Sequence, residues 1–176
     1  MARADLKTIG PAAIFPRYLV AGGTAIQAGE PVHSVATYSS GVASANTLVL
    51  AAADTPTIGT HNFGGVANEN STNVAAGTVA EQWLNVATPV PNVGRIRGKA
   101  ETAASVDTLT ELALIVMDKT LIDYSATGAS DGGELYTIKD TAAADQSGLI
   151  IVGGNTALST LDVVVEGRAY CLDVTN

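Results

Sequence analysis

The sequence predicts a mainly β protein, built as a small β-barrel, a β-tulip or a sandwich, with one or two short helices and an extended N-terminal arm. The 176 residues are 47% hydrophobic but only 15% charged and 5% aromatic, whereas an average soluble domain carries about 25% charged residues. Ala, Thr, Gly, Val and Ser make up the difference, so the core must consist of small and β-branched side chains. Short β-branched runs separated by Gly, Asn, Asp and Thr clusters are typical of strands and turns.

The first 17 residues differ from the rest of the chain in charge and in backbone character. They contain three basic residues and one acidic residue, within a chain of net charge −8. Glycine and two prolines interrupt any regular element in this segment. We therefore expect residues 1–17 to form an extended arm that docks on another chain, and residues 18–176 to form a single β-rich domain. The expected contacts of the arm are the apolar anchors Ile14 and Phe15 and the polar residues Arg3, Lys7 and Arg17.

The remaining sequence predicts a series of short strands. Glycines such as Gly29 and Gly153 supply the turns between them, where positive φ angles are needed. This spacing is typical of a barrel or a sandwich. The expected strands are Arg17–Val20, Pro31–Thr37, Thr47–Leu50, Gly64–Ala67, Thr78–Val86, Val93–Ala100, Thr120–Tyr124, Glu134–Ile138, Leu149–Val152, Leu161–Glu166 and Arg168–Val174.

Two segments have helical features. Thr108 and Glu111 have the spacing of a capping box ahead of the apolar run Leu112–Met117. The same run, short and rich in Ile and Val, is also compatible with a buried strand, so helix and strand both remain open for it. Asp140–Gln146, followed by Gly148, has the start and stop residues of a helix of one or two turns.

The sequence contains no pattern that supports catalysis or a bound cofactor. Gly128–Gly132 matches the G-x-S-x-G string around Ser130, but both histidines precede it and a strand is expected after it, unlike the order in α/β-hydrolases. A polar hairpin loop explains the string better. The candidate metal ligands His33, His61 and Cys171 are widely separated, without the short spacing of a zinc site. We therefore expect no enzyme activity, no metal and no cofactor.

The charge and the hydropathy pattern exclude two further classes of partner. A net charge of −8 disfavours binding to nucleic acid, which needs a basic surface. No run of about 18 apolar residues is available to cross a membrane.

Residues 1–7 show no basic start followed by an apolar run, so no secretory signal is expected.

Two features outside the arm are candidates for an interface. Arg95, Arg97 and Lys99 share one face of an expected strand because side chains alternate. These residues either form a solvated strand edge that resists unwanted pairing or contact an acidic neighbouring subunit. Trp83, the only tryptophan, is either a core or rim anchor or an interface hot spot.

Five segments within residues 18–176 have turn-and-strand patterns of a recognisable kind. They are Ile26-Gln27-Ala28-Gly29-Glu30-Pro31-Val32, Gly64-Gly65-Val66-Ala67, Val74-Ala75-Ala76-Gly77-Thr78-Val79, Gly148-Leu149-Ile150-Ile151-Val152-Gly153-Gly154-Asn155 and Leu161-Asp162-Val163-Val164-Val165. These segments resemble the small decoration proteins, also called cement or head-stabilising proteins, of tailed-phage capsids. The resemblance implies a β-barrel or tulip fold without enzyme activity. It also implies a place on the outer surface of a virion, after assembly in the host cytoplasm.

The partners implied by this resemblance are the major capsid protein and further copies of the same chain, in a homotrimer that bridges capsomers and stabilises the shell. Two other classes remain open: another virion part, such as a head-fibre base or a tail component, and a carbohydrate-binding or adhesin-like β-domain. The few aromatic residues count against the carbohydrate-binding class, because sugar-binding surfaces usually display several of them.

Overall fold

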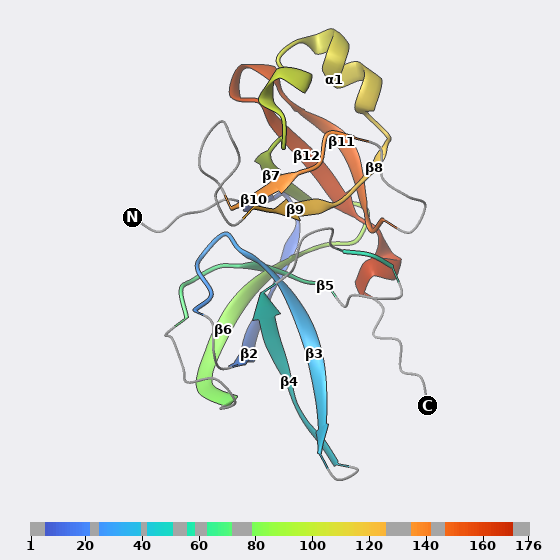
Figure 1. The fold of residues 1–176 in the computed structure, drawn as a ribbon. Coiled ribbons are helices and arrows are strands. Elements are labelled where there is room, and N and C mark those ends of the chain that lie inside the picture. The colour runs from blue at the N-terminus through green and yellow to red at the C-terminus, as the bar shows by residue number, and fades with distance from the viewer. Residues whose placement is uncertain are drawn as a thin grey trace.

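The fold is mainly β, as the sequence predicts. The computed structural model describes residues 6–21, 25–39, 42–50, 56–58, 63–71, 79–125, 135–141 and 147–170, and gives only the backbone for 13–21, 34–39, 42–50, 79–83 and 170. In Figure 1 the described strands form two groups, a five-stranded sheet in the upper part and a ring of strands below it.

The upper sheet is antiparallel throughout. Its strands come from both ends and the middle of the chain, so segments far apart in the sequence lie side by side (Figure 1). A β-bulge between Ile151 and Gly153 shifts the register between two neighbouring strands, Leu149–Asn155 and Thr160–Val165. In spatial order the strands are β1 (Leu6–Ile9), β7 (Arg95–Lys99), β12 (Thr160–Val165), β11 (Leu149–Asn155) and β8 (Lys119–Thr120).

The lower strands pair in a ring that returns to its first member. Strands β2 (Ala12–Ala21) and β4 (Val42–Leu50) pair in parallel, and all other neighbours in the ring pair in antiparallel fashion. Strand β4 also pairs with β3 (Pro31–Ser39), and these two form the long hairpin at the bottom of Figure 1. In pairing order the ring consists of β2 (Ala12–Ala21), β4 (Val42–Leu50), β3 (Pro31–Ser39), β5 (Phe63–Ala67) and β6 (Val79–Pro89).

Short elements complete the upper part. Strands β9 (Ile122–Tyr124) and β10 (Tyr136–Ile138) pair with each other, and Ile138 makes an isolated bridge to Ala100. Helix α1 (Leu109–Ile115) lies at the top of Figure 1. The 3₁₀ helices are η1 (Ala103–Ser105), η2 (Thr156–Leu158) and η3 (Gly167–Tyr170).

One buried cluster joins the two groups of strands. It lies on the inner face of the upper sheet and takes in Phe63 and Val66 from β5 of the ring. Most of its members are aliphatic, and Tyr136 is its largest fully buried side chain. The described core therefore needs residues from both groups. Its other members are Leu6, Ile96, Ala100, Val106, Leu112, Ile122, Ile138, Leu149, Ile151, Leu161, Val163, Val165 and Ala169.

The expected arm is part of these sheets over its described length. Leu6–Ile9 pair with β7, and Ala12–Phe15 pair with the end of β6. Leu6 is fully buried in the core. A boundary at residue 17 is therefore wrong, because this position lies inside β2. The turn at Gly10, where φ is +78°, lets one extended segment pass from the upper sheet to the ring.

Most of the expected strands are present with altered ends, and the last one is wrong. In place of Arg168–Val174 as a strand, Gly167–Tyr170 form η3, and residues 171–176 lie outside the described part. Ala169 donates its backbone N–H to the Glu166 carbonyl and is fully buried. The i to i−3 hydrogen bond at Ala169 is that of a 3₁₀ turn, so Arg168–Tyr170 cannot belong to an extended strand.

The first helical segment is a helix and the second is not confirmed. Leu109–Ile115 form α1 with the complete capping box: the Glu111 backbone N–H donates to Thr108 Oγ1, and the Thr108 backbone N–H donates to the Glu111 carboxylate. Asp140 and Thr141 are not helical, and residues 142–146 lie outside the described part.

Candidate interaction surface

The basic residues of β7 lie on one face, as their alternation predicts. Ile96 and Gly98 are buried on the core face, while Arg95 is exposed and Arg97 and Lys99 are half-buried on the outer face. β7 is not an edge strand, because β1 and β12 pair with its two sides. The explanation of these residues as a protected strand edge is therefore wrong.

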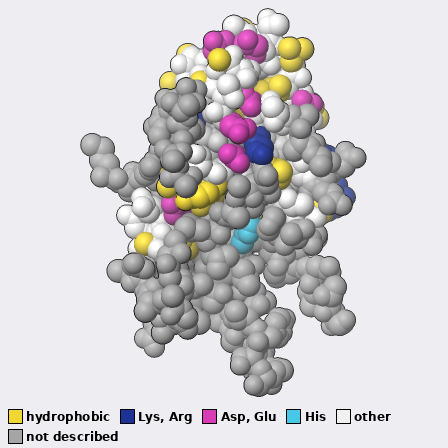
Figure 2. Space-filling model, viewed as in Figure 1, with side chains coloured by type: hydrophobic (Ala, Val, Ile, Leu, Met, Phe, Trp, Pro, Cys, Tyr) yellow, Lys and Arg dark blue, Asp and Glu magenta, His cyan; other side chains and the backbone are white. Residues whose placement is uncertain are grey.

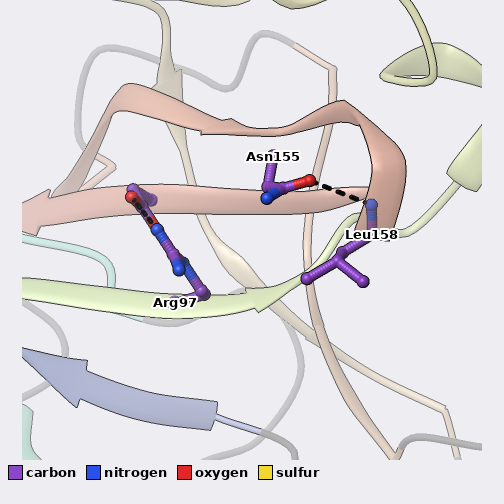
Figure 3. Close-up of polar contacts among 4 residues, drawn as sticks. Arg97, Asn155 and Leu158 are labelled. Atoms are coloured by element: carbon purple, nitrogen blue, oxygen red, sulfur yellow. Dashed lines mark hydrogen bonds and ion pairs between the residues drawn. The ribbon is translucent and has the colours of Figure 1, made fainter.

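Arg97 finds its acidic partner within the same chain. Its Nε and Nη2 atoms donate to the two carboxylate oxygens of Asp162 at 2.6 and 2.7 Å. Figure 3 shows the Arg97 side chain reaching across to the neighbouring strand. The Asp162 side chain is 7% exposed and that of Arg97 is 38% exposed. The hydrogen bond to Asp162 raises the pKa of Arg97 above its ordinary value. Because Arg97 and Asp162 stand opposite each other in the β7–β12 pairing, this ion pair links the two strands.

The other basic residues of this face have different surroundings. Lys99 donates from Nζ to the Leu158 carbonyl at 2.7 Å, next to the turn in which Asn155 Oδ1 accepts from the Leu158 backbone N–H (Figure 3). Lys7 pairs in register with Arg97 and is exposed. Among the described residues, neither Lys7 nor Arg95 has an acidic partner.

The remaining predicted contact residues are placed only in part. Ile14 and Phe15 stand in β2 opposite Ala87 and Val86 of β6, and Trp83 stands opposite Leu19. Their side chains, and that of Arg17, lie outside the described part, as does all of Arg3. The structure thus brings Lys7, Arg95, Arg97 and Lys99 together and leaves the apolar anchors untested.

Sequence reasoning missed an exposed apolar face on α1. Leu109, Leu114 and Met117 are 77%, 76% and 71% exposed, and Ala113 is exposed between them. On the opposite side of the helix, Leu112 packs into the core. Leu109 and Ala113 are one helical turn apart in α1, and Met117 lies two residues beyond the end of the helix, with a φ of +79°. We call residues 109, 113, 114 and 117 the apolar tip. The signal was present in the sequence, since the helix has leucines on both faces.

Carboxylates border the apolar tip. Asp107 is exposed and Glu111 half-buried at the N-terminal end of α1, and Asp118 follows its C-terminal end. At the top of Figure 2, acidic and hydrophobic side chains lie next to each other. The Thr108 hydroxyl donates to Glu111, which lowers the pKa of Glu111, and a hydrogen bond with that carboxylate raises the pKa of Asp107. The border carries negative charge at neutral pH.

The described residues contain no assembled metal or membrane-spanning site. No three of their His, Cys, Asp or Glu side chains are grouped to hold a metal ion. Within the same residues, no helix is long and apolar enough to cross a membrane. The string around Ser130 lies outside the described part.

A scan against protein-family models, a search of curated proteins and a search of solved structures each found no match to this chain.

Proposed function

We propose that this chain is a non-enzymatic structural protein that binds the outer surface of a phage-type capsid and stabilises the shell by bridging capsomers. The observation that carries the proposal is the apolar tip. Large apolar residues that gather on a surface mark a site of contact with another macromolecule. Here Leu109 and Leu114 stand on a short helix that packs into the core through Leu112, and Met117 follows the end of that helix.

The chemistry of the chain supports a binding role at a protein surface. The net charge of −8 fits an outer position better than one facing packaged DNA. The carboxylates beside the tip favour a partner surface with apolar residues and a basic border. The segments that resemble decoration proteins are consistent with the same role, and binding many copies would add to the stability of a shell by mass action.

The apolar tip provides a direct test. Leu109→Ser combined with Leu114→Ser removes two side chains that are more than three-quarters exposed, so the fold is retained. Burial of such a side chain contributes about 1.5–3 kcal/mol, and we expect the double variant to bind shells at least about 100-fold more weakly. The matched control is Val93→Ser, which removes a 57% exposed apolar residue in the turn before β7.

The assay is co-sedimentation with bare tailed-phage shells of the virus that encodes the chain, together with the temperature at which bare and decorated shells open. The proposal requires saturable binding in a fixed ratio to the major capsid protein and a higher opening temperature for decorated shells. Equal opening temperatures would contradict the stabilising role. Binding to tails or fibres alone would favour another virion part, and binding to glycans alone would favour the adhesin-like class.

A further inference from the structure

The upper sheet ends at β1, whose outer edge has no neighbouring strand in the described structure. The Leu6 backbone N–H points away from β7, because it donates to the Gly29 carbonyl at 3.0 Å. Outward and inward groups alternate along an antiparallel strand. The backbone N–H and carbonyl of Thr8 therefore also point away from β7, and no described residue pairs with them.

A groove of about 640 Å³ lies beside this edge. Its volume is within the range of sites that bind small ligands or short peptides. Thr8 lines the groove, and its Oγ1 atom is buried without a hydrogen-bond partner. Most of the other lining residues are small, which leaves room for a backbone to approach, and Leu6, Lys7, Val66 and Asn68 complete the lining. The small residues are Gly10, Ala12, Ala28, Gly29, Ala67 and Ala87.

We propose that this groove binds an extended peptide segment of a partner protein, which adds a strand to β1 and carries small side chains and a carboxylate. Addition of a strand to a free sheet edge draws its affinity from backbone hydrogen bonds and its specificity from the side chains on each face. The unpaired backbone N–H and carbonyl of Thr8 supply the hydrogen bonds, and the alanines and glycines of the lining leave room for small side chains.

The cations beside the groove indicate where the carboxylate of the added peptide would lie. Lys7 is exposed on the outer face of β1, and Arg95 is exposed on the same face of β7. A residue of the added strand that points to this face would have its Cβ about 5 Å from that of Lys7. An acidic side chain there would meet Lys7, which has no acidic partner among the described residues.

The groove favours a single extended segment over a second copy of the folded chain. Residues of β5 and β6 line the groove across from β1, and the Gly29 turn, bonded to both Leu6 and Ala67, closes it at one end, so a whole sheet edge of another copy would not fit. Because the Leu6 backbone N–H already donates to the Gly29 carbonyl, the added segment pairs with the part of β1 around Thr8, and three extended residues, which span about 10 Å, cover Lys7–Ile9. The inference is independent of the virion role proposed above, because its test uses no particle.

The test is an NMR titration of the full chain with the capped peptide acetyl-Ala-Asp-Ala-Thr-Ala-amide. We expect saturable shifts of the Lys7, Thr8 and Ile9 amides, and binding at least about ten-fold weaker for the peptide with Lys in place of Asp. Thr8→Pro removes an N–H that the β1–β7 ladder does not use, so an edge strand tolerates it. It should weaken binding by about ten-fold or more, since about one backbone hydrogen bond is lost and the added strand is displaced.

Two further variants accompany Thr8→Pro, one as its control and one as its replacement. Thr8→Val is the matched control: it keeps the backbone N–H, and we expect less than about three-fold weaker binding. Should Thr8→Pro fail to fold, Ala28→Phe fills part of the groove from the turn beside Leu6 and should abolish binding. The proposal is overturned if the peptide causes no saturable shift, if Ala28→Phe or a folded Thr8→Pro binds as well as the unaltered protein, or if dimerisation of the free protein covers β1.

Discussion

Removal of the Arg97 guanidinium should destabilise the protein more than neutralisation of its partner Asp162. Arg97→Met leaves a carboxylate that is 7% exposed with no cation beside it. Breaking a fully buried pair from one side costs about 3–5 kcal/mol. Because the Arg97 side chain is 38% exposed, water screens this pair, and we expect a loss of about 2–3 kcal/mol.

Asp162→Asn should cost about 1 kcal/mol. The amide oxygen still accepts one hydrogen bond from the guanidinium, and the exposed part of Arg97 can be hydrated. In the double variant no unpaired buried charge remains, so its loss should be smaller than the sum of the two single losses. The difference measures the coupling between the two side chains.

Urea unfolding at neutral pH, followed by circular dichroism, measures these free energies, and equal slopes show that the unfolded states are comparable. The reasoning is refuted if Arg97→Met costs less than Asp162→Asn, or if both cost under about 0.5 kcal/mol, as an exposed ion pair would. In either case the pair would be a surface contact without a role in holding β7 to β12.

Three further outcomes are expected. Gly65→Ala should cost on the order of 3 kcal/mol in urea unfolding, because φ is +127° and a Cβ would lie 2.5 Å from the Ala87 carbonyl oxygen; Gly10→Ala, at φ +78° with no atom within 4 Å, should cost about 1 kcal/mol. The pKa of Glu111 is lowered in the folded protein. The stability that Glu111 adds to α1 is therefore complete above the unfolded pKa of this carboxyl and is lost as the pH falls through its folded pKa. Hydrogen-exchange protection of α1 should fall in that pH range in the unaltered protein and not in Glu111→Gln. Deletion of residues 2–16 removes β1 and the start of β2, and the truncated chain should show no dispersed NMR spectrum; a folded product would contradict the sheet pairing.

The interaction surfaces were only partly accessible from the sequence. Alternation along Arg95–Lys99 predicted which side chains share a face, and the structure confirms it. The number of cations left without a partner was not predictable, because Asp162 is 65 residues from Arg97 and only strand pairing brings them together. The sequence shows that the run after Thr108 has leucines on both faces of a helix, but it does not show which face is buried. Only packing decided that Leu112 is buried and Leu114 exposed.

By itself the sequence determined the β class and several local structures. Short β-branched runs, the Thr108–Glu111 capping box and turn glycines such as Gly29 act over a few residues, so their effects can be recognised without knowing the neighbours. Tertiary structure alone decided that residues 6–15 belong to two sheets and that Gly167–Tyr170 form a 3₁₀ helix. The reason is physical: periodicity specifies which face of a segment is apolar, whereas strand neighbours and free edges depend on contacts between residues far apart in the chain.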